Sequence, residues 1–268
     1  MPFTLSHAAA ALPLRHVLRG AAVLPALVIG CFLPDVPYFL PTPLYNINVH
    51  QLPGLLLFGI PCGWVIYALW FGLLREPSAA LLPQRYAALL LQGPTIPQRR
   101  LVRAWSITVS LLAGAVSHIV WDAFTHRRGF VVHAWPALAQ PVVHVGAYAL
   151  PPYFVLQHGS TFVGFLWLAL HVRQRLRQVT NADIAVVTTP QLSTRRKIAV
   201  VAALAIFSAA IVCGVFSTAN APRLSPYNFV CTCISAAAAV ALMYALAWRA
   251  HHRHAARRAS TLDDASHG

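Results

Sequence analysis

The sequence predicts an all-α, polytopic integral membrane protein, and three features of its composition predict that class. Hydrophobic residues make up 58% of the 268 residues, and the mean hydropathy is +0.62. Only 10% of the residues are charged, against about 25% in a typical soluble domain. The apolar residues also gather in uncharged runs that are long enough to cross a bilayer as helices.

Five such runs predict five transmembrane helices, because a helix needs about 20 apolar residues to cross the hydrocarbon core. The runs are Leu52–Leu74, Ala104–Trp121, Val145–Leu170, Ile198–Phe216 and Asn228–Trp248. The last two are rich in alanine and contain no acidic residue or histidine, which is typical of helices that pack closely together. The five cysteines lie in apolar stretches and are expected to be small buried thiols.

An N-terminal region precedes these spans and is expected to form a re-entrant hairpin or a sixth span. It contains two helical lengths, Leu5–Arg19 and Ala22–Leu33, which meet at Gly20. We favour the hairpin, because it would return His7 to the side of Asp35 and supply this acid with partners in an apolar environment.

The net charge of +14 follows the positive-inside rule of membrane proteins, so no nucleic-acid partner is expected. Most of the basic residues cluster in alternate connections, near residues 77–103, near residues 177–197 and after Trp248. These parts are therefore expected to be cytoplasmic, whereas the loops near 126–144 and 218–227 face outward. We expect one helical membrane domain over residues 1–248 and a basic, polar cytoplasmic tail over residues 249–268.

The stretch SHIVWDAFTHRRG, Ser117–Gly129, places three polar groups at the end of an apolar run. Charged groups inside an apolar segment are costly and usually functional. Residues spaced four apart on a helix rotate by only about 40° per step, so His118, Asp122 and His126 share one face. Imidazole nitrogens and a carboxylate oxygen that converge in this way suit a divalent metal, first zinc, with manganese or iron as alternatives.

Three further groups are expected at the same outer end of the membrane domain. Asp35 lies between Pro34 and Pro37, where a regular helix is disfavoured. His50 comes directly before the first long span, which must run inward to deliver Arg75 to the cytoplasm. His7 joins them if the N-terminal region is a hairpin.

The stretch LQHGSTFVG, Leu156–Gly164, adds a second group of polar residues at a similar depth. His158 could bind the metal or transfer a proton, and Gln157 and Thr161 could orient water or a ligand. The alternative is an interhelical hydrogen-bond cluster, which polar residues in membranes often form. The candidate catalytic residues are therefore Asp122, His118 and His158.

These signatures together resemble a bacterial integral-membrane family that is catalogued only as a domain of unknown function. The resemblance rests on MPFTLSHAAAALPL, IGCFLPDVPYF, SHIVWDAFTHRRG and LQHGSTFVG. The order of the polar groups is also similar to that of the membrane-bound metal-dependent hydrolases, and faintly to the zinc-dependent phospholipase C fold. By that similarity the metal ligands match in order and type: His7, Asp35, His50, His118, Asp122 and His126. The HRGxTH sequence that such hydrolases often carry is missing around His50.

The resulting hypothesis is a metal-dependent hydrolase of the bacterial cytoplasmic membrane that acts on a lipid-like or other amphiphilic substrate. No G-x-S-x-G nucleophile motif occurs, so water activated by metal is the expected attacking group. One alternative is a membrane scaffold or binding protein with a structural metal or a polar cluster. A metal or proton transporter is a weaker alternative, because the last two spans hold no second H-x-x-x-D pair.

Overall fold

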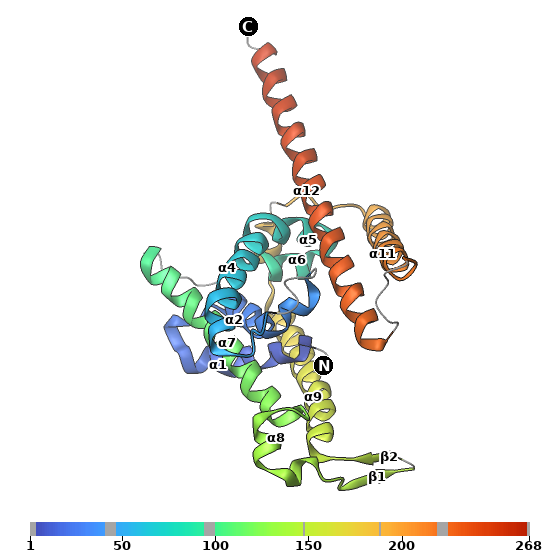
Figure 1. Ribbon diagram of the computed structural model, residues 1–268. Helices are drawn as coiled ribbons and strands as arrows, with labels where there is room; N and C mark the ends of the chain where they lie inside the picture. The colour runs from blue at the N-terminus through green and yellow to red at the C-terminus, as the bar shows by residue number, and fades with distance from the viewer. Residues whose placement is uncertain are drawn as a thin grey trace. The chain divides into compact units, whose positions relative to one another are not determined.

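The predicted all-α membrane class is confirmed by the structure, a computed structural model (Figure 1). It describes residues 4–40, 47–93, 100–146, 148–187, 189–218 and 225–266. Within these ranges five helical stretches are long and apolar enough to cross a membrane: Leu52–Leu81, Arg100–Ala134, Pro152–Gln178, Thr194–Phe216 and Pro226–Arg253.

Each predicted span overlaps one of these stretches, and one prediction needs correction at its start. The run Val145–Leu170 is not helical throughout, because α9 begins at Pro152 and ends at Gln178. The preceding residues form two short antiparallel strands, β1 (Val143–Val145) and β2 (Tyr148–Leu150). Proline lacks the N–H that would continue a strand and is favoured in the first turn of a helix, so the Pro151–Pro152 pair separates the two structures.

The chain divides into two compact units, and the first, Met1–Tyr67 with Gly93–Arg175, contains the polar motifs. Its N-terminal part is a hairpin of short helices: η1 (Thr4–Ala10), α1 (Ala11–Leu18), η2 (Arg19–Ala21), α2 (Leu24–Gly30) and η3 (Leu33–Phe39). The chain reverses at Arg19, whose φ of 48° is positive. Ala11 of α1, Leu27 of α2 and Cys31 then pack together without exposed surface.

This hairpin packs on α7 (Arg100–Thr125), the long helix that carries His118 and Asp122. Two glycines allow the close approach. A Cβ atom on Gly30 would lie 2.3 Å from the carbonyl oxygen of Leu111, and one on Gly114 would lie 2.3 Å from that of Leu27. The Ser110 hydroxyl also accepts a 2.9 Å hydrogen bond from the Val23 N–H, which holds the start of α2 against α7.

The first unit is completed by elements that flank these helices in the chain. The first spanning stretch begins with α3 (Leu52–Gly54), η5 (Leu55–Gly59) and α4 (Ile60–Leu69). Beyond α7 come α8 (Phe130–Ala134), η7 (Pro136–Ala139) and the two strands, which lead to α9. Trp64 of α4 donates a 3.1 Å hydrogen bond to the Thr108 hydroxyl of α7.

The second unit comprises Ala68–Gln92 and Leu176–Gly268. Its elements are η6 (Trp70–Leu74), α5 (Arg75–Leu81), α6 (Gln84–Leu91), α10 (Asn181–Ala185), α11 (Thr194–Phe216) and α12 (Pro226–Ser266). Helices α11 and α12 lie side by side (Figure 1). Arg249 of α12 forms a 3.3 Å ion pair with Glu76 of α5. Because α12 continues to Ser266, the described part of the basic tail extends the last span as a helix. The division between residues 1–248 and 249–268 stays a prediction.

Candidate metal centre

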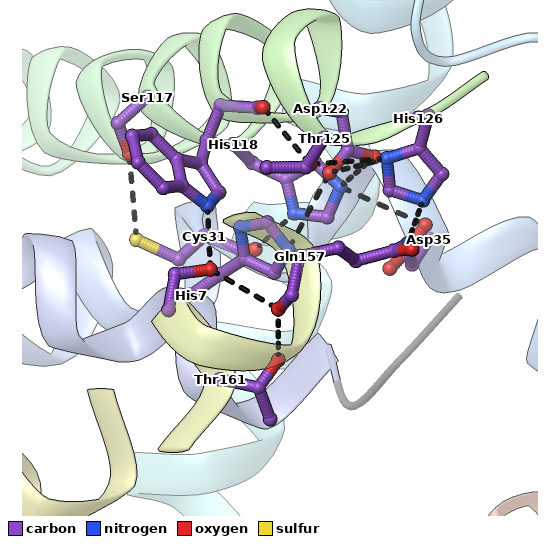
Figure 2. A network of polar contacts seen from close by, with 12 residues as sticks. His7, Cys31, Asp35, Ser117, His118, Asp122, Thr125, His126, Gln157 and Thr161 are labelled. Carbon is purple, nitrogen blue, oxygen red and sulfur yellow. Dashed lines mark hydrogen bonds and ion pairs between the residues drawn. The ribbon is translucent and has the colours of Figure 1, made fainter. Parts of the chain in front are cut away.

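Asp122 lies at the centre of a cluster of four histidines and a second aspartate (Figure 2). Helix α7 presents His118 and Asp122 one turn apart, and His126 follows directly after its last residue, Thr125. The Asp122 carboxylate lies 3.3 Å from His118 Nε2 through Oδ2 and 3.3 Å from His126 Nδ1 through Oδ1. The shared face that the sequence predicted therefore brings all three groups together.

The other three predicted ligands come from separate segments and join the same cluster. His7 of η1 places Nε2 3.5 Å from Asp122 Oδ1. His50, which precedes α3, places Nε2 3.6 Å from Asp122 Oδ2 and 3.8 Å from Asp35 Oδ1. Asp35 of η3 also lies 3.7 Å from His118 Nε2. Six groups from four segments of the chain thus converge, and the hairpin conformation of the N-terminal region is what brings His7 and Asp35 to α7.

His118 is the most strongly oriented of these groups. Its side chain has no exposed surface, and its Nδ1 lies 2.7 Å from the carbonyl oxygen of Cys31. A carbonyl only accepts, so Nδ1–H donates and Nε2 points toward the two carboxylates. Nε2 lies 3.3 Å from Asp122 Oδ2 and 3.7 Å from Asp35 Oδ1. A histidine whose second nitrogen donates to a carbonyl is the usual arrangement of a metal ligand.

His7 stacks on His118, with ring centroids 4.0 Å apart and planes inclined by 22°. His7 lies outside the five spanning helices. Burial and the neighbouring His118 lower the pKa of His7 to about 3. At neutral pH this imidazole is therefore uncharged, which is the form that binds metals.

A small polar pocket adjoins the cluster on the side of His7 and His126. Its lining residues are Ser6, His7, Trp121, Thr125, His126, Gln157, Ser160 and Thr161. Gln157 of α9 donates through Nε2 to His126 Nε2 at 3.1 Å, and the Thr161 hydroxyl donates to the Gln157 carbonyl at 2.8 Å. The structure thus places Gln157 and Thr161 beside the cluster, where the sequence expected groups that orient water or a ligand.

His158 is not brought to the cluster. Its side chain is exposed, its ring lies 4.0 Å from that of Phe154, and its Nδ1 donates to the Phe154 carbonyl of the same helix at 3.0 Å. Gln157 and His158 are adjacent in sequence, and consecutive residues on a helix point about 100° apart. Only Gln157 can therefore face α7.

Sequence reasoning missed two contributors to the site. The Cys31 carbonyl orients His118, but every residue has a carbonyl and no side-chain pattern indicates which one will be used. Trp121 was not among the predicted site residues, yet its Nε1 donates to the Ser160 hydroxyl at 3.1 Å beside the polar pocket. Its position one residue before Asp122 was the available signal.

The donor set fits a divalent metal. Two groups of three potential ligand atoms, in His7, His118 and Asp122 and in Asp35, His50 and His118, each lie within 4.8 Å of one another. Neutral imidazoles and carboxylates are suitable ligands for zinc, manganese and iron. The two carboxylates would also offset the charge of one divalent ion, which lowers the cost of binding it in an apolar environment.

Comparison with known proteins places the chain in one family. The chain belongs to the family DUF4184, described as a domain of unknown function, which matches residues 1–248. No curated protein and no solved structure matches the chain.

Proposed function

We propose that this membrane protein is a metal-dependent hydrolase of the bacterial cytoplasmic membrane that acts on a lipid-like or other amphiphilic substrate. One observation carries the proposal: six side chains of the types that bind metals, from four segments of the chain, converge on one cluster around the Asp122 carboxylate, with His118 buried and oriented toward it.

The chemistry of the proposal follows from the donor set and the polar pocket. A bound divalent metal would lower the pKa of its coordinated water molecule, and it would polarise a phosphoryl or carbonyl oxygen of the substrate. His118 and Asp122 would hold the metal, and Gln157 and Thr161 line the small pocket in which water would be oriented. Aligned polar groups of this kind lower the barrier by positioning the reactants before the reaction begins.

The membrane position of the site supports the choice of substrate. The positive-inside rule predicts a cytoplasmic C terminus and an outward-facing His126 end of its helix. A site at that depth is accessible to the head group of an amphiphile, whose chains would stay in the bilayer. Zinc is the first choice of metal, and manganese and iron are alternatives.

The first test measures metal content and lipid cleavage on the same preparation. The protein is purified in detergent without a polyhistidine tag, as wild type and as Asp122→Asn, with His133→Ala as a control in the exposed segment after α7. We expect wild type and His133→Ala to retain at least about one metal ion per chain, and Asp122→Asn to lose it. Metal-loaded wild type should cleave phosphatidylethanolamine–phosphatidylglycerol vesicles, with products detected by mass spectrometry, and a chelator should stop the reaction.

The remaining outcomes separate the alternatives. Metal without cleavage of any lipid would favour a membrane scaffold or binding protein with a structural metal. Metal-dependent uptake of the ion into sealed vesicles would favour a transporter. No metal in wild type, even after reconstitution, would leave a polar packing cluster and exclude the hydrolase.

A further inference from the structure

The second unit contains a cavity that the candidate metal centre does not use. It lies between α5 and the end of the α12 span, and its volume is about 320 Å³. Pockets that bind small ligands typically measure about 300–1,000 Å³. Its lining residues are Glu76, Pro190, Trp248, Arg249, His252 and Arg253. We propose that this cavity binds the phosphate group of an anionic lipid, an inference that does not depend on the metal site.

Four of the six lining residues come from α12. Arg253 follows Arg249 by one turn of this helix, and a step of four residues rotates a side chain by only about 40°. His252 follows Trp248 in the same way. Side chains four residues apart are near enough to contact the same group. Two guanidinium groups beside one cavity suit a phosphate, because their planar N–H donors pair with its oxygens.

Arg249 is held in place by two contacts that leave some of its donors available. Its Nε donates to the Leu73 carbonyl at 3.3 Å, and its Nη2 lies 3.3 Å from Glu76 Oε2. A guanidinium has five N–H donors, so Arg249 can keep this geometry and still donate to an anion. Glu76 offsets the charge of one arginine, and the second, the exposed Arg253, keeps the cavity positive.

Trp248 provides a second, independent observation. Its indole Nε1 is buried and has no hydrogen-bond partner among the described residues. An indole N–H can only donate, and most buried donors in proteins are paired. The ring of His252 lies 4.1 Å from that of Trp248, and its Nδ1 donates to the Trp248 carbonyl at 2.8 Å. An oxygen of a bound phosphate would supply the acceptor that Nε1 lacks.

The position of the cavity along α12 favours a lipid over a soluble phosphate. Trp248 is the last residue of the apolar run, and Arg249 is the first charged residue after it. Tryptophan and arginine at such a boundary lie at the depth of the lipid head groups. Anionic lipids also attract basic segments that directly follow a membrane helix on the cytoplasmic side, which is the side predicted for this end of α12. The acyl chains of the lipid would stay in the bilayer.

Native mass spectrometry of the full chain, freed of lipid in an uncharged detergent, tests the proposal. Phosphatidylglycerol, zwitterionic phosphatidylcholine and water-soluble glycerol 1-phosphate are added in separate titrations. We expect one phosphatidylglycerol molecule per chain to bind about tenfold more tightly than either of the other two ligands, because two arginines contact its phosphate at the head-group depth.

Two variants of the cavity should weaken the binding of phosphatidylglycerol. Arg253→Gln should lower the affinity about fivefold, whereas Arg196→Gln, which removes the same charge at an exposed position in α11, should leave it unchanged. Trp248→Phe keeps the ring and the charge but removes the N–H donor, and it should lower the affinity by about two- to tenfold. Because Arg253 is exposed, the melting temperature of Arg253→Gln should equal that of wild type.

Glu76→Gln should have the opposite effect, because it releases Arg249 from its ion pair. We expect the affinity for phosphatidylglycerol to rise by about two- to fivefold. Asp183→Asn in α10 removes the same charge outside the cavity and should not change it.

Equal affinities of wild type, Arg253→Gln and Trp248→Phe for phosphatidylglycerol would overturn the site and leave only a general attraction between anionic lipids and a basic chain. If glycerol 1-phosphate bound as tightly as phosphatidylglycerol, the lipid would be the wrong ligand and a soluble phosphate the right one. Melting temperatures in the same detergent show whether each variant is folded.

Discussion

His118 gains its role from a main-chain contact rather than from its sequence neighbours. Its Nδ1 donates to the Cys31 carbonyl, which orients Nε2 toward Asp35 and Asp122. The Cys31 thiol itself is buried, lies 3.8 Å from the Ser117 hydroxyl, and has a pKa that burial raises to about 11. It therefore stays a neutral thiol at physiological pH, as the sequence predicted for a small apolar residue.

Gln157 offers a residue-level test of the metal site, because it is the polar partner of His126. Replacement of a group that orients a metal ligand commonly lowers metal affinity by about 10–100-fold. We expect Gln157→Leu to weaken metal binding by about this factor, whereas Gln157→Glu should retain it, because a carboxylate can accept the His126 Nε2–H.

Competitive chelator titrations of the purified variants measure this difference. His133→Ala again serves as the control, since its side chain is exposed in α8. Equal affinities for Gln157→Leu and wild type would show that His126 binds no metal or needs no orienting partner.

At the scale of elements, the contact between α2 and α7 determines the geometry of the site. Gly30 and Gly114 let the two backbones approach until each helix contacts the carbonyls of the other. Cys31 follows Gly30, and His118 lies one turn after Gly114, so the carbonyl of the first reaches the imidazole of the second. The small residues are therefore required for the candidate metal centre, although neither is one of its potential ligands.

Gly114→Ala should separate the two helices and weaken the site. Its Cβ would lie 2.3 Å from the Leu27 carbonyl oxygen and 2.8 Å from the Cys31 nitrogen, and overpacking of this kind costs about 1–3 kcal/mol. We expect a lower melting temperature in detergent and a reduced metal affinity.

Gly214→Ala is the matched control on α11, because a Cβ atom there would meet none of the described residues outside its own turn of helix within 4 Å. Alanine is favoured over glycine in helices by about 1 kcal/mol, so this variant should keep or slightly raise the melting temperature. A Gly114→Ala protein as stable as Gly214→Ala would contradict the role assigned to the close contact.

At the scale of the whole molecule, the five long apolar helices define a membrane protein, and the distribution of Lys and Arg predicts its orientation. Single cysteines can test that orientation. Ala137 of η7 and Gln84 of α6 are both exposed and lie in connections with opposite predicted sides.

We expect a membrane-impermeant thiol reagent to label Ala137→Cys in intact spheroplasts and Gln84→Cys only after the membrane is permeabilised. The parent chain, with its own five cysteines, provides the background. The opposite labelling pattern would reverse the predicted orientation and place the candidate metal centre near the cytoplasmic face.

The sequence by itself determined the membrane class, the approximate positions of five helices and the candidate ligand types, because hydropathy and four-residue spacing are local properties. It predicted that His118, Asp122 and His126 share a face, and it anticipated Gln157 beside them. It did not determine the start of α9, where the residues before Pro152 form a strand pair.

Only the tertiary structure decided how the distant segments meet. The reversal at Arg19 returns His7 to Asp122, the glycine contact brings the Cys31 carbonyl to His118, and the rotation of α9 selects Gln157 rather than His158. The assignment of His7 and His126 to one Asp122 oxygen and His50 and His118 to the other has the same origin. Distances between segments depend on packing, on helix rotation and on main-chain carbonyls, and none of these has a local signature in the sequence.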